Sequence, residues 1–155
     1  MKLFSVIGVG LLLLAVSSQA ATVSVKVVGI TDGDTVTVID NTKKSYKVRL
    51  DQIDAPERRQ AYGNRAKQHL SALVYKKTVM MDWNSKDRYG RILGTLFYQG
   101  KNINYQMVAD GYAWAYTKYL RDQIYLDAQK VAKRERLGLW SDENPIPPWD
   151  WRKRK

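Results

Sequence analysis

The sequence predicts a small α+β domain, and three observations point to that fold class. Short β-branched or alternating runs fill the N-terminal half, helical apolar stripes lie between and after the later runs, and no linker or repeat divides the chain. The length of 155 residues suits one domain. Five strands of this length with three helices fit a five-stranded Greek-key barrel of the OB type.

The first three strands are expected to form a meander. They cover residues 22–30, 35–39 and 45–50, where apolar and polar residues alternate or β-branched residues dominate. Asp32-Gly33 and Asp40-Asn41 supply the turn signals between them. Two further strands are expected over residues 78–83 and 91–98.

Three helices complete the prediction, over residues 63–75, 103–110 and 120–137. The first carries an apolar stripe that includes Ala66 and Leu70. Gly111 and Gly138 follow the other two and are expected to end them. His69, the only histidine, falls inside the first helix, where an ordinary helical role is expected rather than a catalytic one.

Residues 1–20 are predicted to be a cleaved signal peptide, which leaves residues 21–155 as the mature domain. Lys2 precedes an apolar run over residues 3–16, and Ser18-Gln19-Ala20 has the small-x-small pattern of a cleavage site. The run is shorter than the roughly 20 residues of a spanning helix. Cleavage after Ala20 is therefore favoured over a permanent anchor. We expect an exported protein, periplasmic or secreted, with no stable membrane anchor.

The composition narrows the chemistry. The chain has no cysteine and one histidine, which excludes thiol catalysis, zinc–thiolate sites and sites built from several histidines. Its net charge of +11 favours a polyanionic partner, such as nucleic acid, acidic polysaccharide or an anionic membrane surface, over a role in solubility alone. Any catalysis must come from carboxylates and arginines.

Two acidic motifs each allow two interpretations. Asp32-Gly33-Asp34 is either a plain hairpin turn or a source of oxygen ligands for a hard cation such as Ca²⁺ or Mg²⁺. Asp54-Ala55-Pro56-Glu57 resembles a helix capping box as well as a metal site. Gly63 interrupts the helix that such a cap would start. Asp54 and Glu57 are therefore expected in a loop where a strand ends.

Two arginines accompany these carboxylates. Arg49 lies on the polar face of a predicted strand, and Arg91 ends a polar loop that contains Tyr89. Taken singly, these are an exposed strand face and a charged surface loop. Phosphodiester hydrolysis requires a shielded anion, an oriented water and stabilised transition-state charge. Carboxylates with a cation and two forked guanidinium groups supply each requirement.

Three segments resemble the signature blocks of the staphylococcal nuclease (thermonuclease) family, in the same order and at similar spacing. They are residues 28–35 (VGITDGDT), 48–57 (VRLDQIDAPE) and 87–91 (DRYGR). The segments 111–114 and 138–140 also look like family landmarks, and residues 147–152 are similar to the ending of many exported bacterial members. The resemblance covers nearly all of the mature chain.

The resemblance implies a calcium-dependent, monomeric endonuclease that cleaves the P–O5′ bond of DNA and RNA and leaves 3′-phosphates. It assigns roles to nine positions: metal ligands Asp34, Asp54 and, through its carbonyl, Ala55; catalytic Arg49, Glu57 and Arg91; a neighbour of the metal ligands, Asp32; and nucleotide-stacking Tyr89 and Tyr119. Glu57 acts on the attacking water, either as a general base or as a positioner.

Two other functions also fit a small basic domain. A non-catalytic OB-fold module would bind nucleic acid without cutting it, and a basic exported protein could bind acidic surfaces. Both are disfavoured because the carboxylates and both arginines occur together. The basic C-terminal tail is either a solvated tail or a source of extra, salt-sensitive phosphate contacts.

Overall fold

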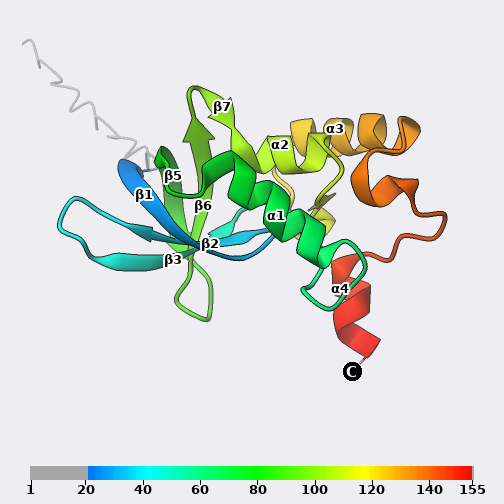
Figure 1. The fold of residues 1–155 in the computed structure, drawn as a ribbon, viewed down its shortest axis with the longest axis horizontal. Coiled ribbons are helices and arrows are strands. Elements are labelled where there is room, and N and C mark those ends of the chain that lie inside the picture. Colours follow the sequence, from blue (N-terminus) through cyan, green and yellow to red (C-terminus); the bar gives the residue numbers. More distant parts are fainter. Residues whose placement is uncertain (1–20, 155) are drawn as a thin grey trace, which may run out of the picture.

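The predicted antiparallel meander is present in the computed structural model, which describes residues 21–154 (Figure 1). It consists of β1 (Ala21–Asp32), β2 (Thr35–Ile39) and β3 (Ser45–Leu50). Alternate residues face inward and are buried, namely Val25, Val27, Val36, Val38 and Val48. This period of two explains why the local pattern was sufficient to predict these strands. The predicted signal peptide lies outside the described residues.

Two further strands close the sheet into a barrel. β5 (Thr78–Lys86) pairs with β1, and β6 (Ile92–Tyr98) pairs with β5. β6 then lies parallel to β3, with Val48 opposite Ile92, which completes a ring of five strands. The short β7 (Lys101–Asn102) turns back and pairs antiparallel with the end of β6. The predicted α+β fold with a five-stranded OB-type barrel is confirmed.

Three helices lie where they were predicted. α1 (Gly63–Val74) packs Ala66, Leu70 and Val74 into the core, against β1. α2 (Ile103–Ala109) and α3 (Gln123–Arg134) pack against each other beside the barrel (Figure 1). α3 is shorter than predicted at both ends. Asp122 caps its start, accepting a hydrogen bond from the backbone N–H of Ile124. Its C-cap is Glu135, followed by Arg136 at φ +54°, so the expectation that Gly138 ends this helix is wrong.

The C-terminal tail differs from the prediction of three helices, because it folds into a fourth. α4 (Pro148–Trp151) lies near the C-terminal end of the chain (Figure 1). Trp149 packs it onto the protein, in a second apolar cluster with Trp114 and Trp140. Short elements complete the fold: β4 (Ile53–Asp54), β8 (Trp114–Ala115), and the 3₁₀ turns η1 (Thr117–Tyr119), η2 (Gly138–Ser141) and η3 (Arg152–Arg154). Within residues 21–154, none of the helices has the length and apolarity needed to cross a membrane.

Candidate active site

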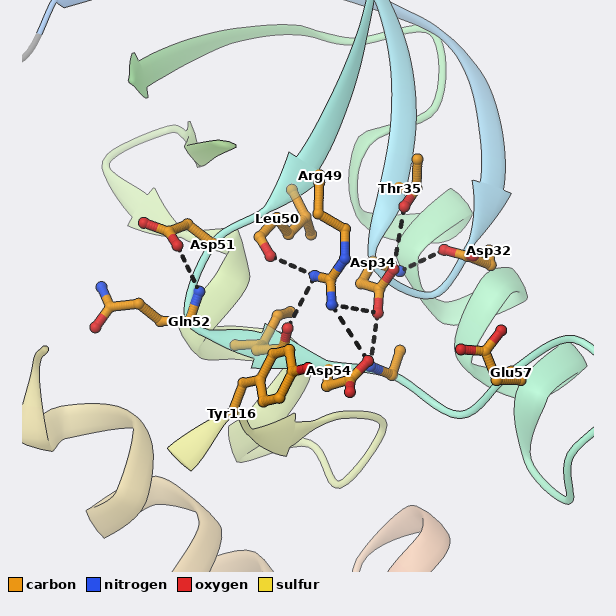
Figure 2. A network of polar contacts seen from close by, with 12 residues as sticks. Asp32, Asp34, Thr35, Arg49, Leu50, Asp51, Gln52, Asp54, Glu57 and Tyr116 are labelled. Atoms are coloured by element: carbon orange, nitrogen blue, oxygen red, sulfur yellow. Dashed lines mark hydrogen bonds and ion pairs between the residues drawn. The ribbon is translucent and has the colours of Figure 1, made fainter. Parts of the chain in front are cut away.

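The turn between β1 and β2 directs one carboxylate into the protein. Asp32 accepts a hydrogen bond from the backbone N–H of Asp34 at 3.0 Å, which tightens the turn. The Asp34 carboxylate accepts hydrogen bonds from the Thr35 hydroxyl at 3.1 Å and from the Ala55 backbone N–H at 2.7 Å (Figure 2). The segment is therefore a hairpin turn that also buries a polar side chain at the barrel rim.

Asp54 reaches the same rim from the two-residue strand β4, which pairs with β8 and places Asp54 opposite Trp114. Its side chain is 1% exposed. α1 begins only at Gly63, and its N-cap residue Tyr62 makes no side-chain capping hydrogen bond. The structure thus excludes the capping-box interpretation. Glu57 lies in the predicted loop, whereas Asp54 belongs to a strand.

Arg49 joins the two aspartates. Its Nη2 lies 3.4 Å from Asp34 Oδ2 and 3.2 Å from Asp54 Oδ1 (Figure 2). Its Nη1 donates to the carbonyl oxygens of Leu50 at 2.6 Å and Ile53 at 2.8 Å. The Arg49 side chain is 12% exposed, so the interpretation as a solvated strand face is wrong. Oxygens of both carboxylates are directed at one positive group.

The acidic side chains titrate abnormally because they are buried together. Burial, followed by repulsion from Asp34, raises the pKa of Asp32 to about 7. Burial also raises the pKa of Asp54 to about 6, against the opposing hydrogen bond from Arg152. Burial alone would raise the pKa of Asp34, but attraction to Arg49 and several hydrogen bonds hold it below its usual value. This excess of negative charge favours additional positive charge at the rim.

The carboxylate and carbonyl oxygens at this site are the kind of ligands that a hard cation binds. Among residues 21–154, no three acidic or histidine side chains converge as a ready-made metal site. Asp34 and Asp54 nevertheless converge on a single point, now filled by the Arg49 guanidinium, and Ala55 lies against Asp34. Ca²⁺ accepts carboxylate, carbonyl and water oxygens, so two carboxylates, the Ala55 carbonyl and waters can hold it.

A residue from the far end of the chain completes this cluster. Arg152 Nη2 lies 2.7 Å from Asp54 Oδ2, and its Nη1 lies 2.7 Å from Glu57 Oε1. The sequence analysis did not single out Arg152, because Asp54 and Arg152 are 98 residues apart. Two signals were present: the basic run at the C-terminus, which does not distinguish one of its residues from another, and the resemblance of residues 147–152 to the ending of exported family members, which assigns Arg152 no role.

Arg91 and Tyr89 lie at the rim in the loop between β5 and β6. Arg91 Nε donates to Asp87 Oδ2 at 2.7 Å, so its ion pair among the described residues is with Asp87 rather than with the buried carboxylates. The parallel register of β3 and β6 sets Arg49 opposite Leu93, which brings this loop beside the Arg49 strand. Tyr89 is 68% exposed, and the Arg91 guanidinium lies 5.6 Å from its ring centre.

Tyr119 stands near the tail. It is 50% exposed in η1 and packs edge-to-face on Tyr116 at 4.8 Å. Tyr116 in turn stacks on Trp149. Of the nine predicted positions, the structure brings Asp32, Asp34, Arg49, Asp54, Ala55 and Glu57 to one place. Among residues 21–154, no hydrogen bond or ion pair joins the side chains of Arg91, Tyr89 and Tyr119 to these residues.

The sequence of this chain matches one family model and several named nucleases. The family model described as "Staphylococcal nuclease homologue" matches residues 47–142. The chain is 51% identical over 130 residues to an uncharacterized endonuclease of Haemophilus influenzae, covering 84% of this chain and 73% of that protein. It is 44% identical over 131 residues to an uncharacterized endonuclease of Escherichia coli, covering 84% and 85%. It is 45% identical over 139 residues to a micrococcal nuclease of Shigella flexneri, covering 83% and 79%.

Proposed function

Because this chain belongs to the staphylococcal nuclease family and is a nuclease, we propose that it is a calcium-dependent phosphodiesterase that hydrolyses DNA and RNA at the P–O5′ bond and leaves 3′-phosphates. The main support for this proposal is that the carboxylates of Asp34 and Asp54 both contact the Arg49 guanidinium. Arg152 in turn links Glu57 to Asp54.

In this proposal Asp34, Asp54 and the Ala55 carbonyl would hold the cation, and Asp32 is an acidic neighbour. A bound cation would supply positive charge that polarises a phosphate oxygen. Arg49 Nη2, which bridges the two aspartates, would then be available to a phosphate oxygen, while Nη1 keeps its bonds to the carbonyl oxygens of Leu50 and Ile53. A guanidinium matches two phosphate oxygens, so Arg49 and Arg91 stabilise the charge that develops on them.

Glu57 accepts a hydrogen bond from the attacking water. Its Oε1 is held by Arg152, and its side chain is 37% exposed, so water reaches it. Within residues 21–154, Oε2 accepts no hydrogen bond from any side chain, which leaves it available to the water. The exposed rings of Tyr89 and Tyr119 offer surfaces on which bases stack. Contacts to phosphate and to base faces do not read the sugar, which supports action on both DNA and RNA.

The rival function is a non-catalytic OB-fold module that binds nucleic acid. Purified protein is incubated with single-stranded DNA or RNA in Ca²⁺, in chelator, and in chelator followed by excess Ca²⁺. We expect cleavage only where free Ca²⁺ is present, and product 3′ ends that become extendable after phosphatase treatment. Binding without chelator-sensitive cleavage would favour the rival, and 3′-hydroxyl products would contradict the proposed bond.

Export and a monomeric state belong to the same proposal. They rest on the predicted signal peptide at residues 1–20 and on the resemblance, respectively. Fractionation of cells that express the full chain, with mass measurement of the exported form, is expected to find the protein outside the cytoplasm and cut after Ala20. Size-exclusion chromatography with light scattering checks the oligomeric state.

A further inference from the structure

The C-terminal segment brings a second arginine, beside Arg49, to the carboxylate cluster. We infer that Arg152 is a positioning residue for the nuclease reaction, which holds Glu57 against Asp54 so that the free oxygen of Glu57 meets the attacking water. The inference rests on the roles proposed above for Asp54 and Glu57. It gives a function to a tail whose sequence suggested only solvation or general phosphate contacts.

The hydrogen bonds of the Arg152 guanidinium support a bracing role. Nη1 donates to Asp54 Oδ1 at 3.1 Å and to Glu57 Oε1 at 2.7 Å. Nη2 donates to Asp54 Oδ2 at 2.7 Å and to the Tyr116 hydroxyl at 3.4 Å. A guanidinium has five N–H donors, so these contacts use all but the one on Nε. Arg152 could grip a phosphate only by giving up the brace.

The backbone that carries Arg152 is itself anchored. The Trp149 ring stacks on Tyr116 with ring centres 5.4 Å apart and planes within 3°. It also packs edge-on against Trp114 at 5.6 Å. Trp114 and Tyr116 lie in and directly after β8, the strand that pairs with β4 and Asp54. The tail and Asp54 are therefore fixed to the same short sheet.

A second contact ties the Glu57 loop to the tail. Gln60 Oε1 accepts a hydrogen bond from the Glu57 backbone N–H at 3.1 Å. Gln60 Nε2 donates to the carbonyl oxygen of Ile146 at 2.6 Å. Glu57 is thus held to the C-terminal segment through its side chain and through its backbone. Such paired restraint limits the positions that the carboxylate can adopt.

The test uses the full chain with Arg152→Ala, Arg152→Lys and the control Lys153→Ala, whose side chain is 78% exposed. For each variant kcat and KM are measured with single-stranded DNA in Ca²⁺, and calcium affinity is measured by calorimetry. We expect Arg152→Ala to lower kcat by about 10- to 100-fold with little change in KM. Arg152→Lys should fall nearly as far, because an ammonium cannot reproduce the fork. Calcium binding is retained, and Lys153→Ala resembles the wild type.

Other outcomes overturn the inference. A higher kcat for Arg152→Ala would mean that the tail competes with substrate or cation. A higher KM that Arg152→Lys restores would mean that Arg152 binds phosphate. If Arg152→Ala keeps the wild-type kcat while Glu57→Ala is inactive, the role of Arg152 is refuted and the proposed function stands. If the wild type itself never cleaves, the proposed function is refuted together with the role of Arg152. Trp149→Leu weakens the packing of α4 and leaves the carboxylates unchanged, so it should also lower kcat. This variant tests the inference if Arg152→Ala does not fold.

Discussion

A Cβ atom on Gly63 would lie 1.9 Å from the carbonyl oxygen of Glu57, so the first residue of α1 packs directly against the backbone of the loop that carries Glu57. The same carbonyl accepts a hydrogen bond from the backbone N–H of Gln60 at 2.8 Å. The position of Glu57 thus depends on residue 63 being a glycine, because any side chain there would meet the Glu57 carbonyl.

The contact predicts that Gly63→Ala impairs catalysis by displacing the Glu57 loop. A displacement of about 1 Å in an active site can cost on the order of 100-fold in rate, and we expect a loss of that size in kcat/KM. Gly29→Ala is the control, because its nearest neighbour, Thr37 Cβ, is at an ordinary contact of 3.4 Å. Wild-type kinetics for Gly63→Ala would show that the loop adapts freely.

Two other glycines separate backbone strain from steric exclusion. Gly100 and Gly111 have nearly the same φ, +77° and +80°, but an added Cβ meets nothing within 4 Å at Gly100 and lies 2.2 Å from the Leu137 carbonyl oxygen at Gly111. Gly100→Ala should cost about 1–2 kcal/mol of unfolding free energy. Gly111→Ala should cost clearly more in the same urea titration, because a backbone contact must also open. Equal costs would contradict this account.

Asp110 predicts a pH-dependent contribution to stability. Burial acts to raise the pKa of Asp110, but hydrogen bonds from His69 and Gln106 hold it below 3.8. A carboxyl whose folded pKa is lowered stabilises the fold above its unfolded pKa and stops doing so as the pH falls through the folded value. Asp110→Asn should therefore be less stable than the wild type at pH 7 by about 1 kcal/mol, the scale of one hydrogen bond. The difference should shrink below pH 4, about the unfolded pKa of Asp. If the difference in unfolding free energy between Asp110→Asn and the wild type does not change with pH, the lowered pKa of Asp110 does not contribute to stability as described.

Glu57→Ala tests the role proposed for this carboxylate. Loss of a group that acts on the attacking water should lower kcat by about 100- to 10,000-fold. Binding of a single-stranded oligonucleotide in Ca²⁺, measured by fluorescence anisotropy, should stay close to that of the wild type, because Glu57 is not among the residues assigned to phosphate. Parallel losses of binding and turnover would mean that Glu57 holds the loop in shape instead.

The sequence was informative where the determinant of structure is local. Alternation predicted the meander, and the 3.6-residue period predicted α1, because burial of one face recurs at each element's own period. Alternation also put Arg49 correctly on the face opposite the core. It could not show that β4 covers that face at the barrel end, where Arg49 meets Asp54.

The tail could not be predicted for a related reason. Its seating depends on the stacking of Trp149 on Tyr116 and on the ion pairs of Arg152, and both join distant parts of the chain. No periodicity encodes such contacts, and a basic terminus has the composition of a solvated one.

The parallel pairing of β3 with β6 also has a consequence for how activity is acquired during folding. The hairpins β1–β2 and β2–β3 are local, but Val48 must find Ile92 before the barrel closes. Non-local pairing of this kind is slow, because the entropy of loop closure is lost before the contacts form. A refolding chain can therefore bring Asp34 and Arg49 together early, while the loop with Arg91 arrives only at closure. We expect nucleolytic activity to return with the slowest folding phase rather than with the first appearance of β structure.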